Sequence, residues 1–341
     1  MTIPATEPLP PRGEIAALIA AIVALLAILQ LHLLSALLAC LLVYELVHML
    51  ASLLGLGRLN ATRAKIIAVA LLATFVVGLL MLLGIGTASL FRHGGDSLPA
   101  LLQKLAEILE NSRGQMPSWL SDYVPSDADE LRQTIAEWLR AHSSALPGAG
   151  RILGTIAAHI LIGMVIGAML ALHQAAPLSA HRPLARAIVS RARRMSLSFR
   201  RVVFAQAWIA GINTAFTALY LVVALPLLGI HLPLVKTMIA LTFVAGLIPI
   251  IGNLISNAVI VLVSLSFSLP MALGSLIFLI AIHKLEYFLN ARIIGSHIRA
   301  RAWELLSAML LMEAAFGIPG LISAPIYYAY LKDELTELQL V

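Results

Sequence analysis

One apolar stretch, Val235–Ser268, constrains the fold of this chain more than any other feature. It is too long for a single membrane crossing, because about 20 residues span the hydrocarbon core. Near its middle, Pro249 removes a backbone donor and Gly252 frees the backbone, so we expect a helix to break there. Broken backbone at membrane depth is tolerated where it is buried in protein or lines a polar cavity, and transporters build binding sites at such breaks. The stretch therefore predicts a helix–break–helix hairpin that enters and leaves the membrane on one side.

Charged residues are scarce along the whole chain. Of its 341 residues 60% are hydrophobic and 12% are charged, whereas a soluble domain carries about 25% charged residues. We predict an all-α integral membrane protein. It is a polytopic helical bundle of about eight apolar segments, two of them broken or re-entrant, with a small extramembrane helical module. The single cysteine, Cys40, cannot form an intramolecular disulfide.

The basic residues lie beside the apolar segments, which gives the chain an orientation. Between residues 174 and 201 there is no acidic residue, and there are seven arginines: Arg182, Arg186, Arg191, Arg193, Arg194, Arg200 and Arg201. The positive-inside rule makes this segment cytoplasmic. Counting back across one span places the net acidic region 86–150 outside. We expect these charges to meet the lipid bilayer and not nucleic acid, because apolar spans flank them.

These observations divide the chain into seven parts. They are an N-terminal tail at 1–14, three transmembrane helices at 15–85, an extracytoplasmic helical module at 86–150, a fourth transmembrane helix at 151–173, the cytoplasmic basic segment at 174–201, a transport core at 202–331 and a C-terminal tail at 332–341.

A second break is expected in the last apolar segment, Trp303–Tyr330. Gly317, Pro319 and Gly320 interrupt it, so it is either a kinked single span or a second hairpin that enters from inside. Glu313 lies one helical turn before this break. An unpaired carboxylate in apolar surroundings is costly, so Glu313 should be paired, protonated or facing water, and it is our first candidate for coupling or binding.

Other polar residues inside apolar spans are secondary candidates. Glu45 and His48 stand three apart and share a helix face, where they could pair, lie at headgroup level or take part in transport. Gln206, Asn213 and Thr217 lie on one helical stripe, which either joins helices or lines a pathway.

The C-terminal part of the chain resembles the autoinducer-2 exporter family of bacterial membrane proteins. The resemblance rests on GLIPIIGNLI, HKLEYFLNARIIG and EAAFGIPGLISAPIYYAYLK, which follow in that order between about residues 199 and 335. It implies a multi-pass protein of the bacterial inner membrane, a homo-oligomer, and export of autoinducer-2 or sodium or lithium/proton antiport. The chain departs from the family pattern at Met312–Ala314, where Glu313 adds a carboxylate that bears on what is bound.

Together these arguments predict a secondary transporter that exports a small polar solute through a site at the two breaks. The path is expected to comprise Pro249, Gly252, Asn253, Asn257, Glu286, Glu313, Gly317, Pro319 and Gly320. A cation/proton antiporter and a non-transporting membrane scaffold remain alternatives. No phosphate-binding loop, metal-ligand spacing or nucleophile arrangement occurs in the sequence, so we expect no enzyme activity, no cofactor and no metal.

Overall fold

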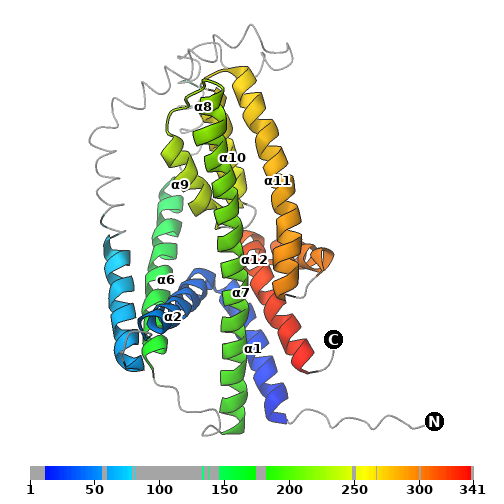
Figure 1. Cartoon of the computed structure of the whole chain (residues 1–341). Coiled ribbons are helices and arrows are strands. Elements are labelled where there is room, and N and C mark those ends of the chain that lie inside the picture. Colours follow the sequence, from blue (N-terminus) through cyan, green and yellow to red (C-terminus); the bar gives the residue numbers. More distant parts are fainter. Residues whose placement is uncertain are drawn as a thin grey trace, which may run out of the picture. The chain divides into compact units, whose positions relative to one another are not determined.

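The computed structural model describes residues 12–55, 60–78, 81, 133, 137, 146–173, 182–247, 251–265, 267–298 and 301–338. Of residues 12, 13, 146, 147, 149, 251, 286–298 and 302 it describes only the backbone. Every regular element in this part of the chain is a helix (Figure 1). Most of the expected extracytoplasmic module, 86–150, lies outside the described residues, so that prediction stays open.

The helices are long and apolar, as the composition predicted. Their bounds are α1 Arg12–Gln30, α2 Leu34–Gly55, α6 Leu146–Leu172, α7 Pro183–Leu219, α8 Leu225–Leu227, α9 Val235–Gly246, α10 Ile251–Leu265, α11 Leu269–Ile298 and α12 Ala302–Glu337, with a π-helix, η2, at Tyr220–Ala224. An unlabelled helix covers Ala61–Gly78. Within the described residues, five helices are long and apolar enough to cross a membrane, and shorter apolar helices accompany them. The chain is a polytopic helical membrane protein.

The chain forms two compact units. The first contains Met1–Leu72, Thr155–Ala205 and Ile293–Val341, and the second contains Ala73–Gly154 and Gln206–Arg292. Helices α7 and α11 each run from one unit into the other.

In the second unit, α9 and α10 form the hairpin that the sequence predicted. Helix α9 ends at Gly246 and α10 begins at Ile251, and the two pack side by side (Figure 1). The close approach needs a glycine, because a Cβ at Gly252 would run into the backbone carbonyl of Ala245. Pro249 lies outside the described residues. The predicted helix–break–helix arrangement is thus confirmed, while its one-sided entry into the membrane stays a prediction.

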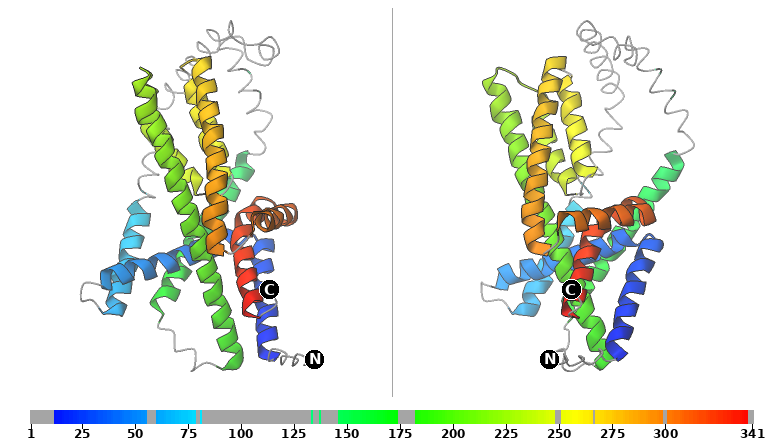
Figure 2. Two further views of the ribbon diagram at one scale, coloured as in Figure 1. Left: turned by 45° about the vertical axis from the view of Figure 1, so that its right-hand side comes forward. Right: turned by 90° about the vertical axis from the view of Figure 1, so that its right-hand side faces the viewer.

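In the first unit, α12 is broken at Gly317. This residue has φ 65° and ψ −148°, a conformation that only glycine adopts readily. The two arms, before and after the break, fold back on each other: Lys332 Nζ donates a hydrogen bond of 2.7 Å to Glu304 Oε2, and the Tyr328 hydroxyl donates to the same carboxylate. Figure 2 shows the change of direction between the brown and red parts of this helix. Of the two alternatives left open by the sequence, the helical hairpin describes α12.

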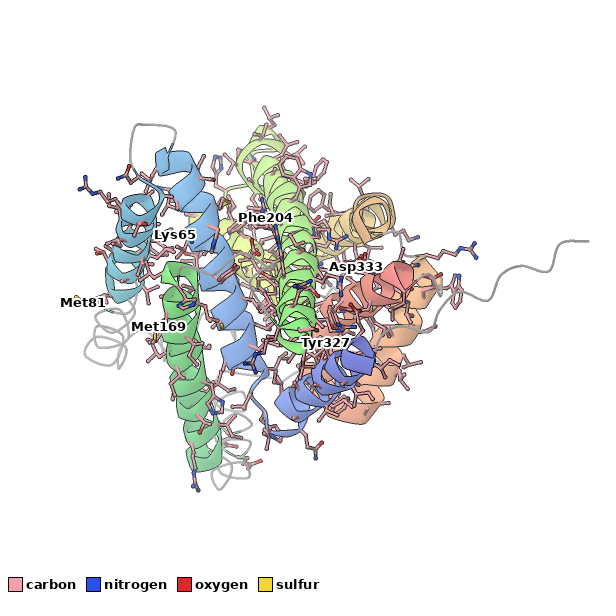
Figure 3. All side chains as sticks on the ribbon, turned by 90° about the horizontal axis from the view of Figure 1, so that it is seen from below. Lys65, Met81, Met169, Phe204, Tyr327 and Asp333 are labelled. Atoms are coloured by element: carbon pink, nitrogen blue, oxygen red, sulfur yellow. The ribbon has the colours of Figure 1, made fainter. Side chains whose placement is uncertain are left out.

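The basic segment is not a separate loop. From Pro183 onward it is the first half of α7 and continues without interruption into the following apolar span. One face of this first half of α7 packs on the second arm of α12, which follows Gly317. Figure 3 labels Asp333 and Tyr327 on that arm. Met195 and Phe199 of α7 share a buried apolar cluster there with Tyr330.

Ion pairs run along the same contact between α7 and α12. We call this cluster the ionic seam: Arg191, Arg194, Arg201, Asp333 and Glu334. Arg194 Nε lies 2.9 Å from Glu334 Oε1, and the Ser198 hydroxyl donates a 3.0 Å hydrogen bond to Asp333. Arg191 and Glu334 are almost fully buried, so each needs the opposite charge of the other.

Candidate functional site

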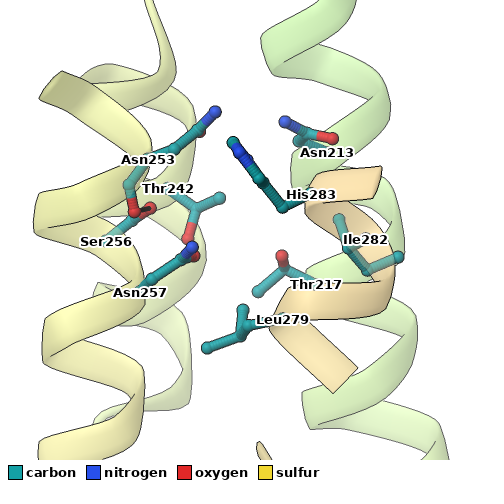
Figure 4. A pocket seen from close by; sticks show the side chains of 9 residues that line it. All are labelled: Asn213, Thr217, Thr242, Asn253, Ser256, Asn257, Leu279, Ile282 and His283. Carbon is teal, nitrogen blue, oxygen red and sulfur yellow. Dashed lines mark hydrogen bonds between the residues drawn. The ribbon is translucent and has the colours of Figure 1, made fainter. Parts of the chain in front are cut away.

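Polar side chains gather around one pocket in the second unit. It is lined by Asn213, Thr217, Thr242, Asn253, Ser256, Asn257, Leu279, Ile282 and His283, as Figure 4 shows. Seven of these nine residues are polar, although the helices α7, α9, α10 and α11 that carry them are apolar. The cavity itself has a volume of about 10 Å³, about the space that one water molecule needs. The pocket as it stands is therefore small and polar, and a small solute would have to widen it.

Two helical stripes supply most of the polar groups. Asn213 and Thr217 are four residues apart on α7, and Asn253 and Asn257 are four residues apart on α10, so each pair projects from one helix face. Ser256, one turn beyond Asn253, joins the second stripe. The sequence predicted the stripe on α7 and named Asn253 and Asn257 as path residues; the fold places the two pairs across the pocket from one another (Figure 4).

Gln206, which belongs to the same polar stripe of α7, holds the end of α9. Gln206 Nε2 donates a hydrogen bond of 2.8 Å to the carbonyl of Gly246. The last carbonyls of a helix have no partner within the helix, so this contact satisfies one of those exposed by the break. Gln206 thus positions the hairpin, and it is not among the residues that line the pocket.

The hydrogen bonds around the pocket leave polar groups for a solute. Thr242 and Ser256 each donate to a carbonyl of their own helix, at 2.8 and 3.2 Å, which leaves their hydroxyl oxygens as acceptors. Within the described part of the chain, the side chains of Asn213, Thr217 and Asn257 make no hydrogen bond to another protein group. Amides and hydroxyls can both donate and accept, so the pocket can match the hydroxyl and carbonyl groups of a small molecule.

The lining carries no carboxylate, lysine or arginine among the described residues. His283 is its single titratable side chain. The same part of the chain holds no cluster of histidine, cysteine or acidic residues that could bind a metal. The described lining of the pocket therefore offers neutral hydrogen-bonding groups and one imidazole.

A comparison with protein families covers almost the entire sequence. The model described as AI-2E family transporter matches residues 15–339. The chain belongs to the AI-2E transporter family. This is a family of membrane transporters and not of enzymes, and the match extends the C-terminal resemblance over the N-terminal helices. No curated protein and no solved structure matches the chain.

The second helix break of this AI-2E transporter, at Gly317 in α12, lies in the first unit. Gly317, Pro319 and Gly320 form the bend and the start of the second arm of α12, and Gly320 is buried where that arm passes Met312. Glu313 is exposed on the first arm. These residues are not among those that line the pocket, and their role in transport stays a prediction.

The remaining acidic and basic candidates have other surroundings. Glu286 lies in α11 with its side chain outside the described ones. Glu45 is buried in the first unit, where it accepts a 2.5 Å hydrogen bond from the Ser196 hydroxyl. The Nδ1 of His48 lies 2.8 Å from the carbonyl oxygen of Tyr44. Glu45 and His48 thus have separate partners, and the pairing that their spacing allowed is not what the structure shows.

Sequence reasoning missed three of the polar residues that line the pocket: Thr242, Ser256 and His283. Ser256 had a usable signal, because it stands three residues from Asn253 on the same helix face. Thr242 lies one turn before the end of α9 and could have been found from its nearness to the break. His283 had no such signal, since it ends an apolar span beside Lys284 and resembles a residue at headgroup level.

Proposed function

We propose that this protein is a permease of the bacterial inner membrane that exports a small, neutral, polar solute such as autoinducer-2 through the pocket on α7, α9, α10 and α11. The observation that carries the proposal is the composition of the pocket: seven polar side chains from four apolar helices, without a carboxylate among the described lining residues. Polar groups in apolar spans are costly and are retained where they serve a substrate path. A membrane scaffold has no use for them.

The neutral lining favours a neutral solute over a cation. A dehydrated cation gains most from carboxylate ligands, whereas hydroxyl and carbonyl groups are matched by amides and hydroxyls that both donate and accept. Each such hydrogen bond contributes about 0.5–1.5 kcal/mol net. Of the predicted path, Asn253 and Asn257 are the residues that line the pocket.

The proposal is tested with the purified protein in liposomes loaded with autoinducer-2, whose efflux is measured directly. Thr217→Val removes one lining hydroxyl without changing side-chain size. We expect the half-saturating concentration to rise about 2- to 10-fold, from the loss of one hydrogen bond.

Thr214→Val is the matched control for this change. Thr214 stands on the same helix but outside the lining, and its hydroxyl already bonds to the Ala210 carbonyl at 2.7 Å. Its substitution costs the helix an internal hydrogen bond and should leave efflux unchanged. Equal effects of the two substitutions would show that the pocket is not the solute site. If correctly folded protein shows no efflux at all, a non-transporting membrane scaffold becomes the better explanation.

A cation/proton antiporter is a second candidate because of Glu313. This carboxylate is exposed on the first arm of α12, one turn before the break at Gly317, in otherwise apolar sequence. A pH-sensitive dye inside the liposomes would report sodium- or lithium-driven proton movement. That signal, lost in Glu313→Gln, would support the antiporter, and its absence with autoinducer-2 efflux intact would exclude it.

The orientation and assembly are part of the proposal. We place the arginine-rich first half of α7 in the cytoplasm and residues 86–150 outside, from the charge bias described above. Cysteine labelling at Ser296, near the C-terminal end of α11, tests the side. The one-sided hairpin requires that this position is labelled from the cytoplasm and not from outside. The homo-oligomer implied by the family is tested by light scattering in detergent.

A further inference from the structure

The arginines of the basic segment fall into two groups in the structure. Three of them, Arg191, Arg194 and Arg201, belong to the ionic seam with α12. The others are exposed and follow one another at intervals of four, seven and seven residues: Arg182, Arg186, Arg193 and Arg200. This spacing places them on one face of α7, which Arg182 directly precedes. We call this face the outer arginine stripe. Packing on α12 explains the position of the first group but not of the stripe.

The stripe leads into exposed aromatic side chains as α7 enters its apolar half. The guanidinium carbon of Arg200 lies 5.9 Å from the ring centroid of Phe204. Phe204 is 41% exposed, and Trp208, one turn further along the same helix, is 65% exposed. Exposed aromatic residues directly after basic ones are typical of a helix that passes from the lipid headgroups into the hydrocarbon. The sequence of side chains on this face therefore places Arg200 at headgroup level.

Distance along the helix decides which other arginines reach the headgroups. At about 1.5 Å per residue, Arg193 lies about 10 Å beyond Arg200, and Arg182 lies about 27 Å beyond it. The polar layer on each side of the hydrocarbon is about 5–8 Å thick, and a long arginine side chain can extend toward it. Because α7 continues from its apolar half without interruption, Arg193 reaches this layer with Arg200, and Arg182 lies outside it.

Glu45 is the acidic neighbour of these two arginines. Its Oε2 lies 3.9 Å from Arg200 Nη1, while its Oε1 accepts a 2.5 Å hydrogen bond from the Ser196 hydroxyl. A guanidinium has five N–H donors, and the side chain of Arg200 is 55% exposed. Arg200 therefore keeps donors for a second anion. Two arginines and one carboxylate leave this part of the face with one formal positive charge.

We propose that Arg193 and Arg200 bind the phosphate group of an anionic phospholipid, whose first acyl carbons lie against Phe204. This inference does not depend on which solute the protein transports. Guanidinium groups bind phosphate oxygens through paired, charge-assisted N–H bonds. A zwitterionic lipid offers the same phosphate, but its own ammonium cancels the attraction to the arginines. From the usual contribution of a basic residue at an anionic membrane surface, each arginine should favour the anionic lipid about fivefold.

Quenching of tryptophan fluorescence by brominated lipids tests this inference with the full chain in vesicles. The signal of Trp208 is the difference between the unsubstituted protein and Trp208→Phe. Brominated phosphatidylglycerol should quench this signal at a lower mole fraction than brominated phosphatidylcholine. Arg193→Gln and Arg200→Gln should each reduce the preference about fivefold, and high ionic strength should also reduce it.

Arg182→Gln is the matched control. It removes the same charge from the same face at a position too far from the headgroups, so the preference should be unchanged. Arg193→Lys and Arg200→Lys keep the charge and should retain most of the preference, which separates loss of charge from loss of fold. Equal quenching by the two lipids, or equal losses in the lysine and glutamine variants, would overturn the inference. So would displacement of the lipid by inorganic phosphate, which would indicate a site for the free anion. The solute pocket is tested separately, by efflux.

Discussion

Removal of the buried carboxylate of the ionic seam should destabilise the first unit strongly. In Glu334→Ala, Arg194 loses contacts of 2.9 and 3.3 Å, and Arg191 loses a carboxylate oxygen 3.6 Å from its Nε. The side chains of Arg191 and Glu334 are 2% and 1% exposed. Breaking a buried pair costs about 3–5 kcal/mol, because an uncompensated charge stays buried. Glu14 also lies 3.6 Å from Arg191, but it is 45% exposed and therefore screened, so we expect the lower end of that range.

Glu337→Ala is the matched control for this prediction. Glu337 is on the same arm of α12 and reaches the same Arg194, at 3.7 Å, but it is 68% exposed. Exposed ion pairs contribute about 0–1 kcal/mol. The assay is unfolding in detergent followed by tryptophan fluorescence, with both variants at one pH and ionic strength. Glu334→Ala should lose several times more stability than Glu337→Ala. Equal losses of stability in the two variants would refute the claim that the ion pairs of Glu334 stabilise the fold because they are buried.

Three further substitutions test the helix packing and the breaks. Gly163→Leu should weaken the contact of α6 with α2 and lower the melting temperature, because even a Cβ at Gly163 would run into the Ala36 backbone; an unchanged melting temperature contradicts that contact. Gly317→Ala should cost about 1–3 kcal/mol in the same unfolding assay, since φ 65° is strained for any residue with a side chain, whereas Gly274→Ala, in open space on α11, should cost little. Glu313→Gln should leave solute efflux unchanged, because the carboxylate does not line the pocket; slower efflux would show that the second unit takes part in solute coupling.

The breaks could be predicted from the sequence because their causes are local. A glycine inside an apolar stretch is visible in the sequence and indicates a close approach or a positive φ. Gly252 and Gly317 both lie where the chain changes helix direction. The ionic seam could not be predicted. Arg194 and Glu334 are 140 residues apart, and several other acidic residues could equally have paired with the arginines of α7. The same arginines were treated as a separate segment, since charge bias reports the side of the membrane and not whether a helix continues.

The polar stripes of the pocket were predictable one helix at a time. The i, i+4 spacing groups Asn213 with Thr217 and Asn253 with Asn257, but nothing in the sequence says that the two stripes face each other. Glu313 was preferred because a carboxylate in apolar sequence is conspicuous. The described lining of the proposed pocket has no carboxylate, and its ionisable member, His283, was inconspicuous beside Lys284; the role of Glu313 stays a prediction.

The distribution of charge fits the different demands on the two regions. A contact that holds helices together benefits from buried ion pairs, because breaking one is expensive. A transport site must also release its solute. If a small solute engages four or five neutral groups of the pocket, at about 0.5–1.5 kcal/mol each, the sum is about 2–7.5 kcal/mol, which corresponds to a Kd no tighter than about 3 µM. Such a site releases its solute readily.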